Sequence, residues 1–286
     1  MLSPLAAHAI CAGLCVADYL ARAWRIQLLA RGINASLGFR DALAVNAIGD
    51  AACSLTPLRI AGEPARLGVM LHAGVPSTAA FVAISYEVLA AWPVIILCAG
   101  SLMWRFAPQW WERAAPGLAD SLRDAWPWVA AVTLLTLGLW LWVRRSAPAS
   151  SRHLRRPIKR IMVHWRRMPL PILLATAPLT FINLASRVAI LPVLAAMLPD
   201  PPPLGPLLVG SFALLYSQLI LPTPSGAGAV ELGFLGGAAG NLGTGEGGLL
   251  LAWRFYTTGV GIGLGLLMGS HRFGRRAITR WFSRKM

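Results

Sequence analysis

Long stretches without any charged residue divide this chain. A helix needs about 20 apolar residues to cross the ~30 Å hydrocarbon core of a bilayer. Seven stretches contain no Asp, Glu, Lys or Arg: 2–17, 88–104, 125–143, 168–186, 188–199, 201–230 and 255–270. This pattern predicts an all-α polytopic membrane protein. The expected full transmembrane helices number five: 3–20, 76–103, 126–143, 169–198 and 247–269.

Two further apolar stretches, 41–74 and 205–242, are interrupted by proline and glycine. The first is apolar at DALAVNAIGDAACSL and breaks at TPLRIAGEP, and the second is apolar at GPLLVGSFALLYSQLIL and breaks at PTPSGAGAVE. Neither half of either stretch approaches ~20 apolar residues. We therefore expect two re-entrant helical hairpins.

The hairpins and their flanking spans form two similar halves. A first repeat, 3–103, reads span, hairpin, span, and a second repeat, 169–269, reads the same with the opposite orientation. Both breaks place Thr-Pro first, then small residues, then Glu. Paired interruptions at matching positions of two halves indicate a binding site between them. We predict a single transmembrane domain, 1–286, built as an inverted repeat around the connecting helix 126–143.

Charge is scarce and sits mainly between the spans. Of the 286 residues, 13% are charged, compared with about 25% in soluble domains. The net charge is +15, and the stretch 144–167 holds nine Lys/Arg and no acid. Basic loops of this kind stay on the cytoplasmic side. We expect an inner-membrane protein whose basic loop 144–167 and basic tail 270–286 are cytoplasmic and contact anionic lipids, and no binding of nucleic acid.

No motif of an enzyme or a resident cofactor is present. The histidines and the four cysteines lack metal-ligand spacing, and the sequence has no HExxH, GxSxG or P-loop. The run GVGIGLG (259–265) lies inside the last span, where glycines favour close helix packing. We expect no catalytic residues, no metal and no cofactor.

The residues with candidate chemistry cluster at the two breaks. Non-helical backbone at membrane depth must be buried in protein or line a wet cavity. A charge there costs about 2.5–3.5 kcal/mol on insertion scales, so it is usually paired or functional. The candidate binding residues are Arg59, Gly62, Glu63, Arg66, Glu87, Pro224, Gly226, Gly228, Glu231 and Arg254, and Arg187 also lies inside an apolar span. Two interpretations stay open: internal ion pairs, such as Glu63 with Arg66 and Glu231 with Arg254, or a site for an anionic group.

At these breaks the sequence resembles the lysylphosphatidylglycerol synthase transmembrane-region family, also called flippase-like membrane proteins. The segments that carry the resemblance are LTPLRIAGEPARLGVML (55–71), Tyr86-Glu87, LPTPSGAGAVELGFLGG (221–237) and AWRFYTTGVG (252–261). The family often continues with E-R-x-x-D, whereas here Val-Leu-Ala-Ala-Trp follows Glu87. The soluble aminoacyl-transferase domain of some members is absent, so lysyl transfer is not expected.

The resemblance implies movement of a membrane lipid, with relatives that accompany hopanoid or glycolipid synthesis. It points to Arg59, Arg66 and Arg254 as phosphate contacts, and to Glu63 and Glu231 as their partners or as proton carriers. Two alternatives remain: a non-transporting scaffold for lipid-modifying enzymes that docks them on 144–167, and a small-solute transporter. Expected partners are membrane lipids and either a second copy of the chain or enzymes of lipid synthesis.

Overall fold

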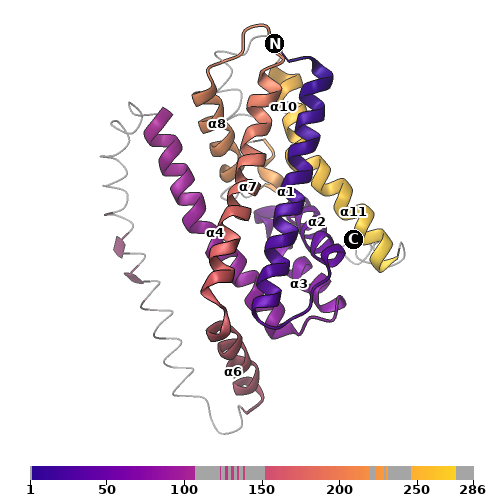
Figure 1. Ribbon diagram of the computed structural model, residues 1–286, viewed down its shortest axis with the longest axis vertical. Coiled ribbons are helices and arrows are strands. Elements are labelled where there is room, and N and C mark those ends of the chain that lie inside the picture. The colour runs from indigo at the N-terminus through magenta and orange to yellow at the C-terminus, as the bar shows by residue number, and fades with distance from the viewer. Residues whose placement is uncertain are drawn as a thin grey trace.

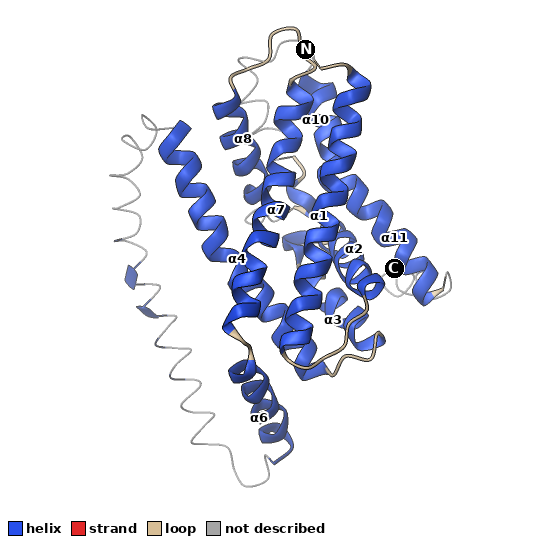
Figure 2. Cartoon of the chain, viewed as in Figure 1, coloured by secondary structure: helices blue, strands red, loops and turns tan. Residues whose placement is uncertain are grey.

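The fold is that of a computed structural model, which describes residues 2–106, 152–218, 223–228, 230 and 246–274, with isolated residues between 123 and 138. Within these ranges every regular element is a helix (Figure 2). Most of the predicted connecting helix 126–143 falls outside the described residues, and Glu231 and the tail from residue 275 lie outside them entirely. The all-α fold class is confirmed.

Four helices are long and apolar enough to cross a membrane. They are α1 (Pro4–Gly32), α4 (Ser77–Phe106), α7 (Leu170–Ala195) and a last span over Gly247–Phe273. The last span consists of α10 (Glu246–Arg254), a π-helical turn, η5 (Phe255–Gly259), and α11 (Val260–Phe273). These correspond to four of the five expected spans, and the fifth stays a prediction.

Helix α1 extends well beyond the predicted span 3–20. Arg22 and Arg25, which follow that span in the sequence, lie inside the helix and are buried. The helix can continue past these charges because Asp50 of another helix pairs with Arg22 and Glu87 pairs with Arg25.

The first broken stretch forms two antiparallel helices. Helix α2 (Phe39–Leu55) leads into a 3-10 turn, η1 (Pro57–Arg59), and α3 (Gly62–His72) returns along it. Gly62 faces the Cys53 side chain so closely that a Cβ atom there would overlap its sulfur. The helix–break–helix form matches the prediction, and its placement as a re-entrant element stays a prediction.

The second broken stretch repeats the local geometry of the first. After α8 (Leu204–Ser217), the turn η3 (Pro224–Gly226) has an extended threonine before the proline, as η1 does. In each turn the N–H three residues after that threonine donates to the threonine carbonyl: Arg59 to Thr56 at 3.2 Å and Gly226 to Thr223 at 3.0 Å. The matching Thr-Pro sequences therefore form matching turns.

The directions of the helices follow from contacts along their lengths (Figure 1). Helix α1 is antiparallel to α7, since the Leu2 N–H donates to the Ala196 carbonyl and Gly32 lies against Met168 near the other end. The last span runs parallel to α1, because Tyr256 contacts His8 and Gly261, further along the span, lies beside Tyr19, further along α1. The predicted inverted repeat requires these directions, while the boundaries 3–103 and 169–269 stay predictions.

Residues 152–167 of the predicted basic loop form a helix, α6 (Arg152–Arg167). Its apolar residues Ile161 and Trp165 pack against the core beside α4, where the Tyr86 ring stacks on Trp165 with centroids 4.5 Å apart. Lys159 and Arg160 are exposed. The segment is an amphipathic helix because its apolar residues recur on one face.

Candidate functional site

The two breaks meet at a buried contact. The Ser225 hydroxyl donates to the Ser54 carbonyl at 3.1 Å, joining η3 to the end of α2. Arg59 and Ser225 have positive φ angles of 56° and 53°, a conformation that L-residues other than glycine seldom adopt. Strained backbone of this kind persists where the surrounding structure imposes it, often at functional sites.

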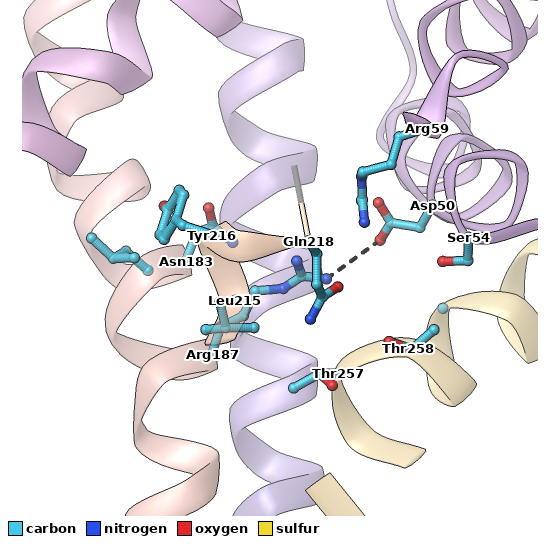
Figure 3. A pocket seen from close by; sticks show the side chains of 12 residues that line it. Asp50, Ser54, Arg59, Asn183, Arg187, Leu215, Tyr216, Gln218, Thr257 and Thr258 are labelled. Atoms are coloured by element: carbon cyan, nitrogen blue, oxygen red, sulfur yellow. Dashed lines mark ion pairs between the residues drawn. The ribbon is translucent and has the colours of Figure 1, made fainter. Parts of the chain in front are cut away.

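A polar cavity of ≈ 110 Å³ lies beside this junction (Figure 3). A water molecule needs at least about 10–15 Å³ of free volume, so the cavity has room for several waters or a small anionic group. The polar side chains of its wall come from α2, η1, α7, η5 and the C-terminal end of α8: Asp50, Ser54, Arg59, Asn183, Arg187, Tyr216, Gln218, Thr257 and Thr258. The rest of the described wall is formed by Leu184, Leu215 and Gly261.

An ion cluster that we term the cavity cluster adjoins this space: Asp18, Arg22, Asp50 and Arg187. Arg22 binds Asp50 through both guanidinium nitrogens, at 2.9 and 2.7 Å, and also donates to Asp18 at 3.0 Å. Arg187 donates to Asp18 at 3.2 Å and lies 3.8 Å from Asp50. The cluster contains two acids and two arginines and is neutral.

Arg59 adds a positive charge to this neutral cluster. Its side chain lines the cavity opposite Arg187, with Asp50 between them (Figure 3). No acidic side chain among the described residues lies within ion-pair distance of Arg59. The described surroundings of the cavity therefore carry one positive charge in excess, which favours an anionic guest.

Gln218 supplies a second unsatisfied group in the wall. Its side chain is 5% exposed, and its Nε2 has no hydrogen-bond partner among the described residues. A buried amide donor without a partner costs about 1–3 kcal/mol. A ligand oxygen in the cavity would remove that cost.

A second ion cluster, which we term the closed cluster, lies about one turn further along α1: Arg25, Arg66, Glu87 and Glu63. Glu87 is 2% exposed and accepts from Arg25 at 2.7 Å and from Arg66. Arg66 also lies 3.3 Å from Glu63, as the ion-pair interpretation predicted. None of these four side chains lines the cavity as far as it is described.

The predicted site residues are thus divided among several places. Of those that the structure describes, Arg59 alone lines the cavity. Gly62 serves the packing of α3 on α2, and Pro224, Gly226 and Gly228 form the second turn. Arg254 donates to the carbonyls of Ser225 and Gly226, at 2.7 and 3.5 Å, and holds that turn. Glu231 lies outside the described residues.

Sequence reasoning missed Asp18 and Asp50, which organise the cavity cluster. One signal was available: Asp18, Arg22 and Arg25 are spaced i, i+4 and i+7, which places them on one face of a helix. Asp50 is the lone acid within the apolar part of α2. Both acids stand in stretches where a charge is costly, so both are candidates by the same rule that singled out Arg187.

In the described part of the chain, no group of three or more His, Cys, Asp or Glu side chains could hold a metal ion. The fold and the site define a multi-pass membrane protein with a positively charged polar cavity between two broken helical segments. The family model described as the lysylphosphatidylglycerol synthase TM region matches residues 4–265. The chain belongs to this family. Searches of curated proteins and of solved structures found no match to this chain.

Proposed function

We propose that this protein moves a polar or anionic lipid between the leaflets of the inner membrane. The family supports a role with membrane lipids. The observation that carries the proposal is the cavity between the two breaks, with excess positive charge from Arg59 and an unpartnered donor on Gln218. A lipid phosphate needs both a positive charge and hydrogen-bond donors when it leaves water.

In this proposal the head group occupies the cavity while the acyl chains remain in the bilayer. Arg59 and Arg187 approach the space from opposite sides and contact the phosphate. Arg187 is 28% exposed at its side chain and is held by Asp18 and Asp50, so its position is set before the lipid arrives. No bond is made or broken, and the basic helix α6 and the tail lie on the cytoplasmic side.

In this proposal Arg66 and Arg254 do not contact the phosphate; they hold neighbouring parts of the protein in place. Arg66 is occupied by Glu87 and Glu63, and Arg254 by the carbonyls of the second turn. This differs from the expectation that the resemblance implied for these two residues. The arrangement supports Arg59 and Arg187 as the head-group arginines.

The exposed charge of α6 favours one alternative, a scaffold that docks lipid-modifying enzymes. Lys159 and Arg160 face away from the core. Under the scaffold hypothesis, reversing these two charges abolishes function and substitutions in the cavity matter little. Lipid movement predicts the opposite ranking.

The test is a leaflet-specific assay in proteoliposomes with phosphatidylglycerol that carries a fluorescent acyl chain. Arg59→Gln is compared with Arg160→Gln, a matched loss of one charge at an exposed position. We expect Arg59→Gln to slow transbilayer movement about tenfold or more, the equivalent of one lost charged contact, and Arg160→Gln to leave it unchanged. The absence of protein-dependent movement across a broad lipid panel would refute the proposal.

A further inference from the structure

An apolar groove runs along the outside of the molecule between α1 and the last span. On α1 its wall is a stripe at helical spacing: Ala12, Cys15, Val16, Tyr19 and Leu20. On the last span it continues through Phe255, Tyr256, Val260, Leu264 and Met268, and on α2 through Leu43 and Ala47. Its volume is ≈ 680 Å³. Val16 and Phe255 are 58% and 59% exposed, so the groove opens outward.

The groove lies against the polar cavity along one helical turn. The π-helical turn η5 places Phe255 and Tyr256 in the wall of the groove, while its next residues, Thr257 and Thr258, line the cavity. Single π-helical turns inside longer helices are rare and frequently mark functional sites. Here the turn separates an apolar space from a polar one.

One hydrogen bond also connects the wall of the groove to the wall of the cavity. Tyr19, in the groove wall, donates through its hydroxyl to the Asp50 carboxylate, in the cavity wall, at 3.0 Å. Gly261 packs against this bond: a Cβ atom added to it would lie 3.1 Å from the Tyr19 hydroxyl. The Tyr19 hydroxyl and Gly261 thus lie between the groove and the cavity cluster at this point.

The dimensions of the groove fit one acyl chain. From Ala12 to Leu20 it follows α1 for roughly 12 Å, at 1.5 Å per residue. One leaflet of a bilayer has a hydrocarbon thickness of about 15 Å, half of the ~30 Å core. Two of its three walls, α1 and the last span, belong to helices that are long and apolar enough to span the bilayer, so acyl chains are the apolar groups expected to reach the groove.

We propose that this groove binds one acyl chain of the lipid whose phosphate enters the cavity, with the Tyr19–Asp50 bond at the passage between the two. The assignment rests on the proposed function for the identity of the lipid. It adds a chain-binding site on the bilayer-facing side and a residue, Tyr19, at the boundary. A small-solute transporter has no use for such a site, since its substrate has no chain to accommodate.

Photolabelling tests the groove without requiring transport. The purified protein is reconstituted in vesicles with phosphatidylglycerol that carries a diazirine midway along one acyl chain, and adducts are mapped by mass spectrometry. We expect adducts on the groove residues Val16 and Leu264 to exceed those on Leu266 about tenfold. Leu266 is exposed on the same helix, roughly 160° around it from Leu264 at 100° per residue. Equal labelling of groove and non-groove residues would overturn the proposal.

A matched pair of substitutions provides the second measurement. Leu264→Trp fills the groove, and Leu266→Trp adds the same bulk outside it. We expect Leu264→Trp to lower labelling at Val16 about tenfold and Leu266→Trp to leave it intact. If labelling concentrates in the groove but no lipid changes leaflet, lipid movement is refuted and the chain site stands. If lipid moves while labelling is uniform and Leu264→Trp has no effect, the chain site is refuted and lipid movement stands.

Discussion

The two ion clusters each pair two arginines with two carboxylates and both include residues of α1, yet only one borders the described cavity. The cavity cluster takes Asp18 and Arg22 from α1, and the closed cluster takes Arg25 from the next turn. In the closed cluster the side chains of Arg25, Arg66 and Glu87 are 8%, 13% and 3% exposed, and Glu63 at its edge faces outward; in the cavity cluster Arg187 is 28% exposed and lines the cavity. The buried charges of this chain therefore occur in two settings: one cluster borders the cavity, and the other does not.

Arginine at membrane depth is not by itself evidence of a binding site. In the closed cluster Glu87 and Glu63 together balance Arg25 and Arg66, so the pairing leaves no charge available for a ligand. In the cavity cluster the pairing is also complete, but Arg59 and Gln218 add a charge and a donor from the two breaks. The breaks, more than the buried ion pairs, make the site.

The largest expected effect is on the closed cluster. Glu87→Gln leaves Arg25 and Arg66 buried without their shared carboxylate, and breaking a buried ion pair from one side costs about 3–5 kcal/mol. We expect a loss of that size in the free energy of unfolding, measured by denaturation in detergent micelles. Glu63→Gln is the control, because Glu63 is 52% exposed at its side chain and its pair with Arg66 is worth about 0–1 kcal/mol. Equal losses for the two variants would contradict the role of Glu87.

The next effect concerns the packing that brings Arg66 toward Glu87. In Gly62→Ala the new Cβ meets the Cys53 side chain, and overpacking of this kind costs about 1–3 kcal/mol. Gly68→Ala on the same helix has nothing within 4 Å of its new Cβ and is expected to be neutral or slightly stabilising. The double variant Gly62→Ala/Cys53→Ala should recover most of the loss, as a thermal unfolding series would show. Failure to recover would place the strain elsewhere.

A smaller loss of stability is expected when a charge is removed from the cavity cluster. In Arg187→Gln, Asp18 and Asp50 keep Arg22 as their partner, and water in the cavity can solvate the remaining charge. We expect the free energy of unfolding to fall by about 1–2 kcal/mol, less than in Glu87→Gln. A hydrogen bond to a charged group contributes about 1.5–3 kcal/mol, and water in the cavity replaces part of it here. Lipid movement in the same preparation should fall about tenfold or more. A stability loss as large as that of Glu87→Gln would erase the distinction between the clusters.

The sequence predicted the spans and the breaks well, since both depend on local pattern. Hydropathy located α4 and α7, and the repeated Thr-Pro predicted two breaks that fold into matching turns. The cavity was harder to predict from the sequence, because its wall depends on which helices pack together. Arg22 follows an apolar span and looks like a loop residue until Asp50 of α2 is seen to bind it. Gln218 carries no charge, so only its burial beside the cavity reveals it.

The smallest effect on stability, and the sharpest test of the difference between the clusters, concerns Gln218. Its Nε2 has no partner among the described residues and faces a cavity with room for water, so replacing the amide breaks no hydrogen bond within the described part of the protein. Gln218→Met should therefore leave the free energy of unfolding unchanged or slightly raised, while lipid movement falls because the phosphate loses a donor. Ser211→Ala on α8 is the control: its hydroxyl is also buried without a partner, but it does not line the described cavity. We expect that variant to match the stability of Gln218→Met and to keep full lipid movement. If both variants move lipid at the rate of the unsubstituted protein, Gln218 does not contact the lipid, and Arg59 and Arg187 alone bind it.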